Sequence, residues 1–126
     1  MEIKAIPLKS VNGIKFGMKR EEVRKLLGEY EEFKKSVLST NTTDDFGYCH
    51  VYYNKNNEVE AIEIFDADVF VNDEKIYPLE LEKTKNIIKD LEICEETLLS
   101  KSNSIGIYFE NKEMKSILFG IEGYYK

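Results

Sequence analysis

His50 is the only histidine in the chain, and it directly follows Cys49. A cysteine and a histidine make a nucleophilic pair when their side chains share a hydrogen bond. Both residues fall in a β-rich run, residues 48–53, in which neighbouring side chains point to opposite faces. The sequence therefore predicts no Cys–His pair. Since no other spacing pairs a base with a nucleophile, we expect a protein that is not an enzyme.

Two other groups of residues could hold a metal ion. Carboxylates cluster at residues 66–68 and 73–74, and carboxylate oxygens ligate hard cations such as Ca²⁺. Neither cluster has EF-hand spacing or a glycine pivot, so both are interpreted as solvated loops. Cys49 and Cys94 fit no metal-binding spacing and are interpreted as small buried hydrophobic residues. We expect no metal and no cofactor.

The charge balance limits the choice of partner. The chain has 24 acidic and 18 basic residues, a net charge of −6, so we expect it to bind neither nucleic acid nor an anionic membrane. The acidic excess serves solubility or, alternatively, attracts a basic macromolecule such as a nuclease. No apolar run approaches the roughly 20 residues of a membrane span, and the first ten residues lack signal-peptide features. These features indicate a cytoplasmic protein.

The elements that position these residues begin with a short amphipathic helix. Val23, Leu26 and Leu27 recur at helical spacing, which predicts a helix over residues 19–27. Gly28 is well placed as the left-handed residue that ends this helix.

Two strands are expected further along the chain. Helical spacing favours a second helical stretch to about residue 38, and residues 41–45 are typical of a polar loop. Residues 48–53 and 59–65 are rich in β-branched and aromatic side chains, and the turn at 54–58 indicates a hairpin between them.

The second half of the chain repeats this order, with a helix over residues 81–91 and strands at 105–109 and 114–121. We therefore interpret the chain, residues 1–126, as a single domain with pseudo-repeats at about 11–70 and 75–126. The expected fold class is α+β. Two tandem helix–β-hairpin units would form one antiparallel sheet with the helices on one face.

The phrase Gly17-Met18-Lys19-Arg20-Glu21-Glu22-Val23, followed by Leu27-Gly28, resembles the start of the SmpA/BamE-like outer-membrane assembly lipoproteins and of the related β-lactamase-inhibitor-protein fold. The resemblance implies two αββ units under one continuous sheet. In the inhibitor branch, the concave sheet face opposite the helices grips another protein. The chain also looks like the immunity proteins that are encoded beside bacterial polymorphic toxins. It has no lipobox cysteine, so we expect no envelope role.

Strand alternation predicts which side chains would face a partner. Cys49, Val51 and Tyr53 are expected in the core, and the alternate side chains are expected to face outward. The outward set mixes aromatic rings and carboxylates, and aromatic rings are enriched at the energetic centres of protein interfaces. The candidate partner-binding residues are Tyr48, His50, Tyr52, Glu63, Phe65, Tyr108 and Glu110. Tyrosines also favour strands for structural reasons, so a core role for them stays open.

These observations lead to one expected function and one alternative. The expected function is an immunity protein that neutralises a cognate toxin domain, itself basic, by direct protein–protein binding. The alternative is an intracellular small-ligand-binding or assembly module of the SmpA/BamE-like fold. A small molecule retained through purification, or self-association, would favour the alternative.

Overall fold

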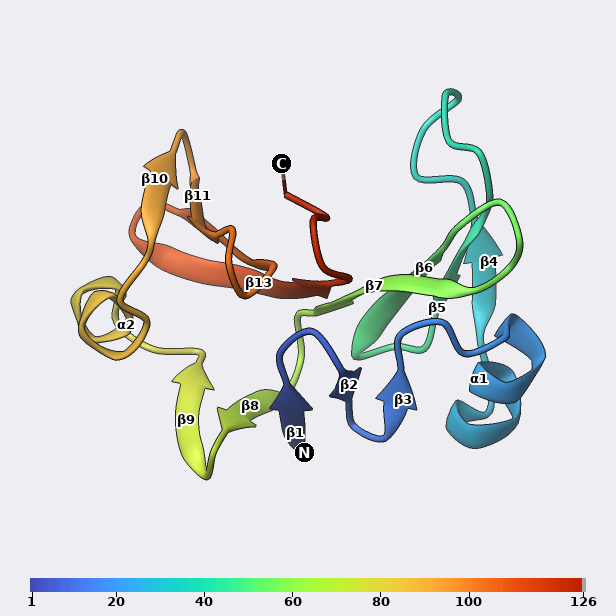
Figure 1. The fold of residues 1–126 in the computed structure, drawn as a ribbon, viewed down its shortest axis with the longest axis horizontal. Helices are drawn as coiled ribbons and strands as arrows, with labels where there is room; N and C mark the ends of the chain where they lie inside the picture. The colour runs from blue at the N-terminus through green and yellow to red at the C-terminus, as the bar shows by residue number, and fades with distance from the viewer. Residues whose placement is uncertain (126) are drawn as a thin grey trace.

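The computed structural model describes residues 1–125 and consists mainly of β-strands. Eight strands form one antiparallel sheet (Figure 1). In spatial order they are β10 (Glu92–Cys94), β11 (Thr97–Ser100), β12 (Ile105–Glu110), β13 (Glu113–Gly120), β7 (Val59–Ile64), β6 (Cys49–Tyr53), β5 (Thr43–Asp45) and β4 (Glu31–Phe33). The central pair, β13 and β7, joins the two halves of the chain.

A second sheet contains five strands. In spatial order they are β3 (Ile14–Lys15), β2 (Ser10–Val11), β1 (Glu2–Ile6), β8 (Asp68–Val71) and β9 (Glu74–Tyr77). β1 and β8 are parallel, and the other neighbours are antiparallel. Ile3 and Ala5 of β1 are buried, and the alternate side chains are exposed. This period of two is typical of a strand with one face against a core.

The hydrophobic core lies between the two sheets. One continuous cluster of buried side chains includes residues of both sheets. The five-stranded sheet contributes Ile3, Ala5, Val11, Ile14, Val69, Ile76 and Tyr77, and the eight-stranded sheet contributes Val51, Ile62, Ile64, Leu98, Ile107, Ile117 and Phe119, among others. Each sheet therefore covers the apolar face of the other.

The two helices, α1 (Arg20–Leu27) and α2 (Leu81–Ile87), lie at opposite ends of the molecule (Figure 1). Each connects a strand of the smaller sheet to an edge strand of the larger one. Neither is long and apolar enough to cross a membrane. Gly28 ends α1 as predicted and has a positive φ of 87°, but its ψ of −133° lies outside the left-handed helical region that was expected.

The expected fold class is wrong. An α+β layout with both helices on one face of a single sheet would need helices long enough to cover that face. The helices have only eight and seven residues, so a second sheet covers the apolar face instead. Most of that second sheet comes from segments for which no strand is predicted above.

Other local predictions have mixed outcomes. The hairpins β6–β7 and β12–β13 are confirmed. The helical stretch expected up to residue 38 is wrong, because the chain forms β4 and then an exposed loop. The polar loop expected at 41–45 is also wrong, since β5 occupies most of it and its Asp44 is fully buried.

The same order of elements occurs twice along the chain. A hairpin, a short helix and four antiparallel strands follow one another as β2–β3, α1 and β4–β7, and again as β8–β9, α2 and β10–β13. β1 stands between the two hairpins in the smaller sheet. The pseudo-repeats at 11–70 and 75–126 remain a prediction at the level of sequence.

Candidate functional site

The face of the eight-stranded sheet that is turned away from the core, called here the outer face, carries a line of acidic side chains. Residues paired directly across antiparallel strands share a face. Glu31 pairs with Asp45, and Asp45 pairs with His50. His50 in turn pairs with Glu63. These four residues, called the acidic row, cross the strands from β4 to β7 and include three carboxylates and no lysine or arginine.

His50 is held between two aromatic rings. The centroid of the Phe65 ring lies 4.8 Å from that of the imidazole, and the Phe33 centroid lies 5.0 Å from it, both in edge-to-face geometry. The imidazole Nε2 is 3.5 Å from Asp45 Oδ2. This packing fixes the imidazole beside a carboxylate of the acidic row, where it can form an ion pair when protonated.

Glu63 is oriented by two hydroxyl groups. The Tyr52 hydroxyl donates to Oε1, and the Ser116 hydroxyl donates to Oε2 over 2.6 Å. Burial and the bond to Glu63 raise the pKa of Tyr52, so its phenol stays protonated as a donor. The Lys35 Nζ lies 4.6 Å from the centroid of the Tyr52 ring. The Glu63 carboxylate is therefore held in one orientation.

The end of the chain folds back over the outer face. After β13, the Tyr124 amide donates to the Ile121 carbonyl over 3.0 Å, which reverses the chain. Tyr124 and Tyr125 then pack on Tyr52 and Leu118. Their two rings meet edge to face with centroids 5.2 Å apart. We call residues 121–125 the tail.

Two glycines make room for the tail. A β-carbon on Gly120 would lie 2.6 Å from Tyr124 Cγ, and one on Gly106 would lie 2.2 Å from the Tyr125 hydroxyl oxygen. Such distances do not occur between real atoms, so the rings can lie there only because both positions are glycine. Nothing in strand alternation indicates this contact, since it depends on where the tail lies.

The structure brings four of the seven candidate residues together. His50, Tyr52, Glu63 and Phe65 lie side by side on the outer face. Tyr108 pairs with Ser116 and lies on the same face, with 40% of its surface exposed. Glu110 is exposed at the end of β12, next to a turn.

Two of the seven are placed differently from expectation. Tyr52 was expected to face solvent, but it is only 7% exposed because the tail covers it. Tyr48 was expected on the outer face, but it packs against the main core, and burial raises its pKa to about 12. The alternation fails there because β6 begins one residue later, at Cys49.

The two cysteines have different environments. Cys49 is buried in the core, and burial raises the pKa of its thiol to about 12. It is therefore a protonated thiol at neutral pH, on the opposite face from His50. Cys94 was expected to be buried, but it is exposed on the edge strand β10.

An ion cluster beneath the end of the acidic row fixes β4 and β5 to α1. Arg24 donates from Nε and Nη2 to the two oxygens of the buried Asp44, each over 2.8 Å. Tyr53 donates its hydroxyl to the same carboxylate over 2.9 Å. The Arg20 guanidinium lies 4.1 Å from the centroid of the Tyr53 ring and donates to the Thr42 carbonyl over 2.6 Å. Strand alternation does not identify this cluster.

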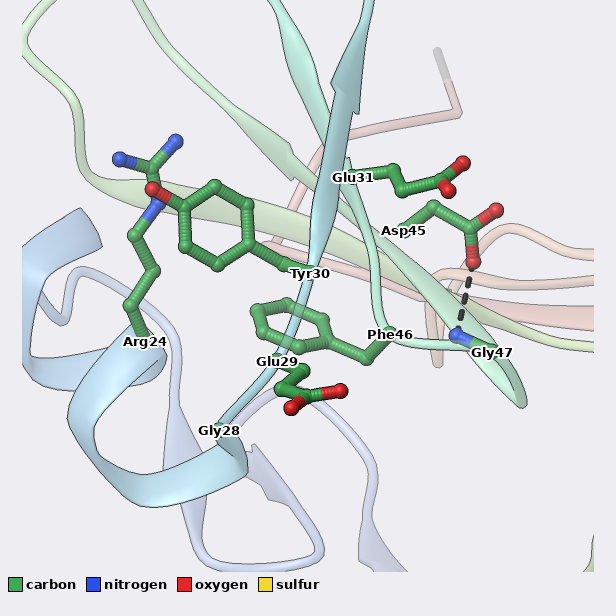
Figure 2. Close-up of a pocket in the computed structure, with 8 residues that line it drawn as sticks. All are labelled: Arg24, Gly28, Glu29, Tyr30, Glu31, Asp45, Phe46 and Gly47. Atoms are coloured by element: carbon green, nitrogen blue, oxygen red, sulfur yellow. Dashed lines mark hydrogen bonds between the residues drawn. The ribbon is translucent and has the colours of Figure 1, made fainter.

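A cleft of 980 Å³, called the edge cleft, opens at the end of the acidic row (Figure 2). The rings of Tyr30 and Phe46 lie within it, with centroids 6.2 Å apart. Carboxylates of Glu29, Glu31 and Asp45 also line it. Asp45 Oδ1 accepts a hydrogen bond from the Gly47 amide over 2.8 Å. Arg24 lines the cleft too, and its guanidinium lies 4.0 Å from the centroid of the Tyr30 ring, so these rings and carboxylates already hold one cationic group.

Within residues 1–125, no group of three or more histidine, cysteine, aspartate or glutamate side chains is arranged to hold a metal ion. Comparisons with protein-family models, curated proteins and solved structures find no match to this chain. By its fold and its site, the chain is a two-sheet β protein with acidic and aromatic side chains on the outer face.

Burial of tyrosines leads to a prediction about alkaline pH. Burial is the largest cause of a raised pKa at Tyr48, Tyr52, Tyr53, Tyr77, Tyr124 and Tyr125. An unfolded tyrosine ionises near pH 10. Above that pH the unfolded chain holds fewer protons than the folded one, so stability falls as pH rises. We expect tyrosinate absorbance to rise together with loss of circular dichroism. Ionisation of all eight tyrosines near pH 10 with the fold intact would contradict this.

Proposed function

We propose that this chain is an immunity protein that neutralises a cognate bacterial toxin domain, itself basic, by binding it directly on the outer face. The observation that carries the proposal is the acidic row. It places Glu31, Asp45 and Glu63 on one side of four neighbouring strands, with only His50 among them. A surface of one sign attracts a partner of the opposite sign.

The charge of the whole chain supports the same partner. The net charge is −6, so long-range attraction adds to the local potential of the acidic row. Such attraction raises the rate of association more than it raises the affinity. A basic toxin domain would therefore be captured quickly, which suits a protein that must act before the toxin does.

Side chains of the outer face are also held in place by contacts within the free chain. Tyr52 and Ser116 hold the Glu63 carboxylate, and two phenylalanine rings hold His50. Groups that are already ordered lose little entropy when a partner binds. Around them, Tyr108 is exposed and the tail tyrosines are half-buried, which supplies aromatic rings for contact with a partner.

The test uses the toxin domain that the neighbouring reading frame is expected to encode. Co-expression of this chain should restore growth to cells that produce the domain. The purified pair should associate several-fold or more slowly at physiological than at low salt, while dissociation changes little. The double variant Glu29→Lys, Glu31→Lys should associate at least about tenfold more slowly. Both side chains are exposed.

A matched control keeps the change in net charge and moves it to the other sheet. Glu2→Lys with Glu74→Lys alters two exposed residues of β1 and β9. This variant should associate faster than the first double variant. If both variants slow association equally, net charge alone matters and the outer face is not the binding surface. If the toxin domain neither binds nor is neutralised, the proposed function is wrong.

A second candidate function is a small-ligand-binding module, and the edge cleft favours it. Its rings and carboxylates would suit an organic cation. Native mass spectrometry of the purified protein separates the candidates. A retained cationic molecule that is lost in Tyr30→Ala would favour the small ligand over the toxin domain.

A further inference from the structure

The loop between β4 and β5 carries the most exposed aliphatic side chains of the described chain. Val37 is 91% exposed and Leu38 is 89% exposed. Figure 1 shows this loop extending well beyond the eight-stranded sheet. Apolar surface in water is unfavourable, and neither side chain belongs to a buried cluster of the described chain. We call residues 36–39 the loop tip.

The loop tip is an ordered turn whose form does not depend on its apolar residues. The Ser39 amide donates to the Ser36 carbonyl over 3.1 Å, and the Ser36 amide donates to the Ser39 hydroxyl over 3.0 Å. The Leu38 amide donates to the Ser36 hydroxyl over 3.2 Å. The two serines therefore hold the turn. Its middle positions usually carry glycine, proline, asparagine, aspartate or serine, so a valine and a leucine there serve something other than the turn.

The base of the loop is fixed to the rest of the sheet. The Asn41 side-chain amide donates to the Asn54 carbonyl over 2.9 Å and to Asn57 Oδ1 over 2.8 Å. On the other side, the Lys35 ammonium lies over the Tyr52 ring. The base of the loop is therefore fixed beside Tyr52 on the outer face, so a partner bound to that face would also meet the loop tip.

We propose that the loop tip inserts Val37 and Leu38 into an apolar pocket of the partner that binds the outer face. This inference rests on the proposed function, since the partner is the same basic toxin domain. Insertion would bury both side chains and recover the free energy that their exposure costs. Net charge favours this occupant over two others: an anionic membrane repels a chain of net charge −6, although Lys34 and Lys35 precede the loop tip, and a second copy carries the same negative charge.

The test uses one double variant that carries both Val37→Ser and Leu38→Ser. It is compared with the original chain. The unfolding midpoint should not change, because both side chains are exposed in the free protein. Affinity for the toxin domain should fall at least about tenfold, through faster dissociation that does not depend on salt. Ile93→Ser is the matched control, since Ile93 is 60% exposed on β10 at the far end of the sheet, and it should bind like the original chain.

The possible results separate this inference from the proposed function. If the original chain binds the toxin domain and the double variant binds equally well, the insertion is wrong and the proposed function stands. If the original chain does not bind the toxin domain, both are wrong. Two further results would overturn the inference. If the original chain floats with vesicles of anionic phospholipid and the double variant does not, the loop tip binds a membrane. If the original chain self-associates in sedimentation and the double variant does not, the loop tip binds a second copy.

Discussion

Asp44→Ala is expected to lower the free energy of unfolding by about 3–5 kcal/mol, the scale found when one partner of a buried ion pair is removed. Its carboxylate is fully buried and accepts two hydrogen bonds from Arg24 and one from Tyr53. Removing it leaves the Tyr53 phenol without its acceptor, and Arg24 keeps only its bond to the exposed Glu32. The nearly buried Arg20 also loses its nearest negative charge, 3.9 Å away. Urea unfolding of both proteins measures the difference.

Glu32→Gln is the control for this prediction. Glu32 also pairs with Arg24, over 3.1 Å, but its side chain is substantially exposed to water. Water screens that pair and can replace it, so the loss of stability should be much smaller than in Asp44→Ala. Similar losses in the two variants would mean that burial does not distinguish the two carboxylates and that Asp44 is not the centre of the cluster.

Gly120→Ala is expected to cost about 1–3 kcal/mol by overpacking. The added methyl group would lie 2.6 Å from both Cβ and Cγ of Tyr124. Those atoms lie close to the backbone, so the tail must move as a whole. Gly106→Ala should cost less, because its methyl group meets the hydroxyl end of Tyr125, which can swing aside. Thermal unfolding of both variants measures the difference.

A double-mutant cycle isolates the role of the tail. In a chain that ends at Gly123, alanine at position 120 should cost little, because the atoms it would strike are gone. The coupling between the two changes should therefore be as large as the cost of Gly120→Ala alone. A cost that persists in the shortened chain would show that position 120 needs glycine for its own backbone rather than for the tail.

Local patterns in the sequence predict the central part of the fold. The alternation in residues 48–53 and 59–65, with the turn between them, predicts β6 and β7, and helical spacing predicts α1 and α2, although α2 ends at Ile87 and not at residue 91. The second sheet is missed although residues 2–6 alternate clearly. Its other strands are two to four residues long, too short for a period to emerge from the sequence.

Only part of the candidate site is predicted, because local patterns report the residues of one strand and not the pairing of distant strands. Alternation within one strand correctly places His50, Glu63 and Phe65 on the outer face. The acidic row also needs the pairing of β4 with β5 and of β5 with β6, because only the register aligns Glu31 and Asp45 with His50. The segment that holds them was predicted as helix and loop. Tyr52 is buried by side chains more than seventy positions away, and no local pattern reports such a contact.

The pairing of β7 with β13, and of β1 with β8, also affects the risk of aggregation while the chain is being synthesised. The N-terminal half leaves the ribosome first, and at that moment β7 and β1 both lack the neighbour that will later cover one edge. Their open edges can pair with other chains, and contacts between distant segments form slowly. Aggregation during synthesis should therefore depend on how soon the second half of the chain becomes available, which makes translation speed and chaperone supply relevant to the yield of folded protein.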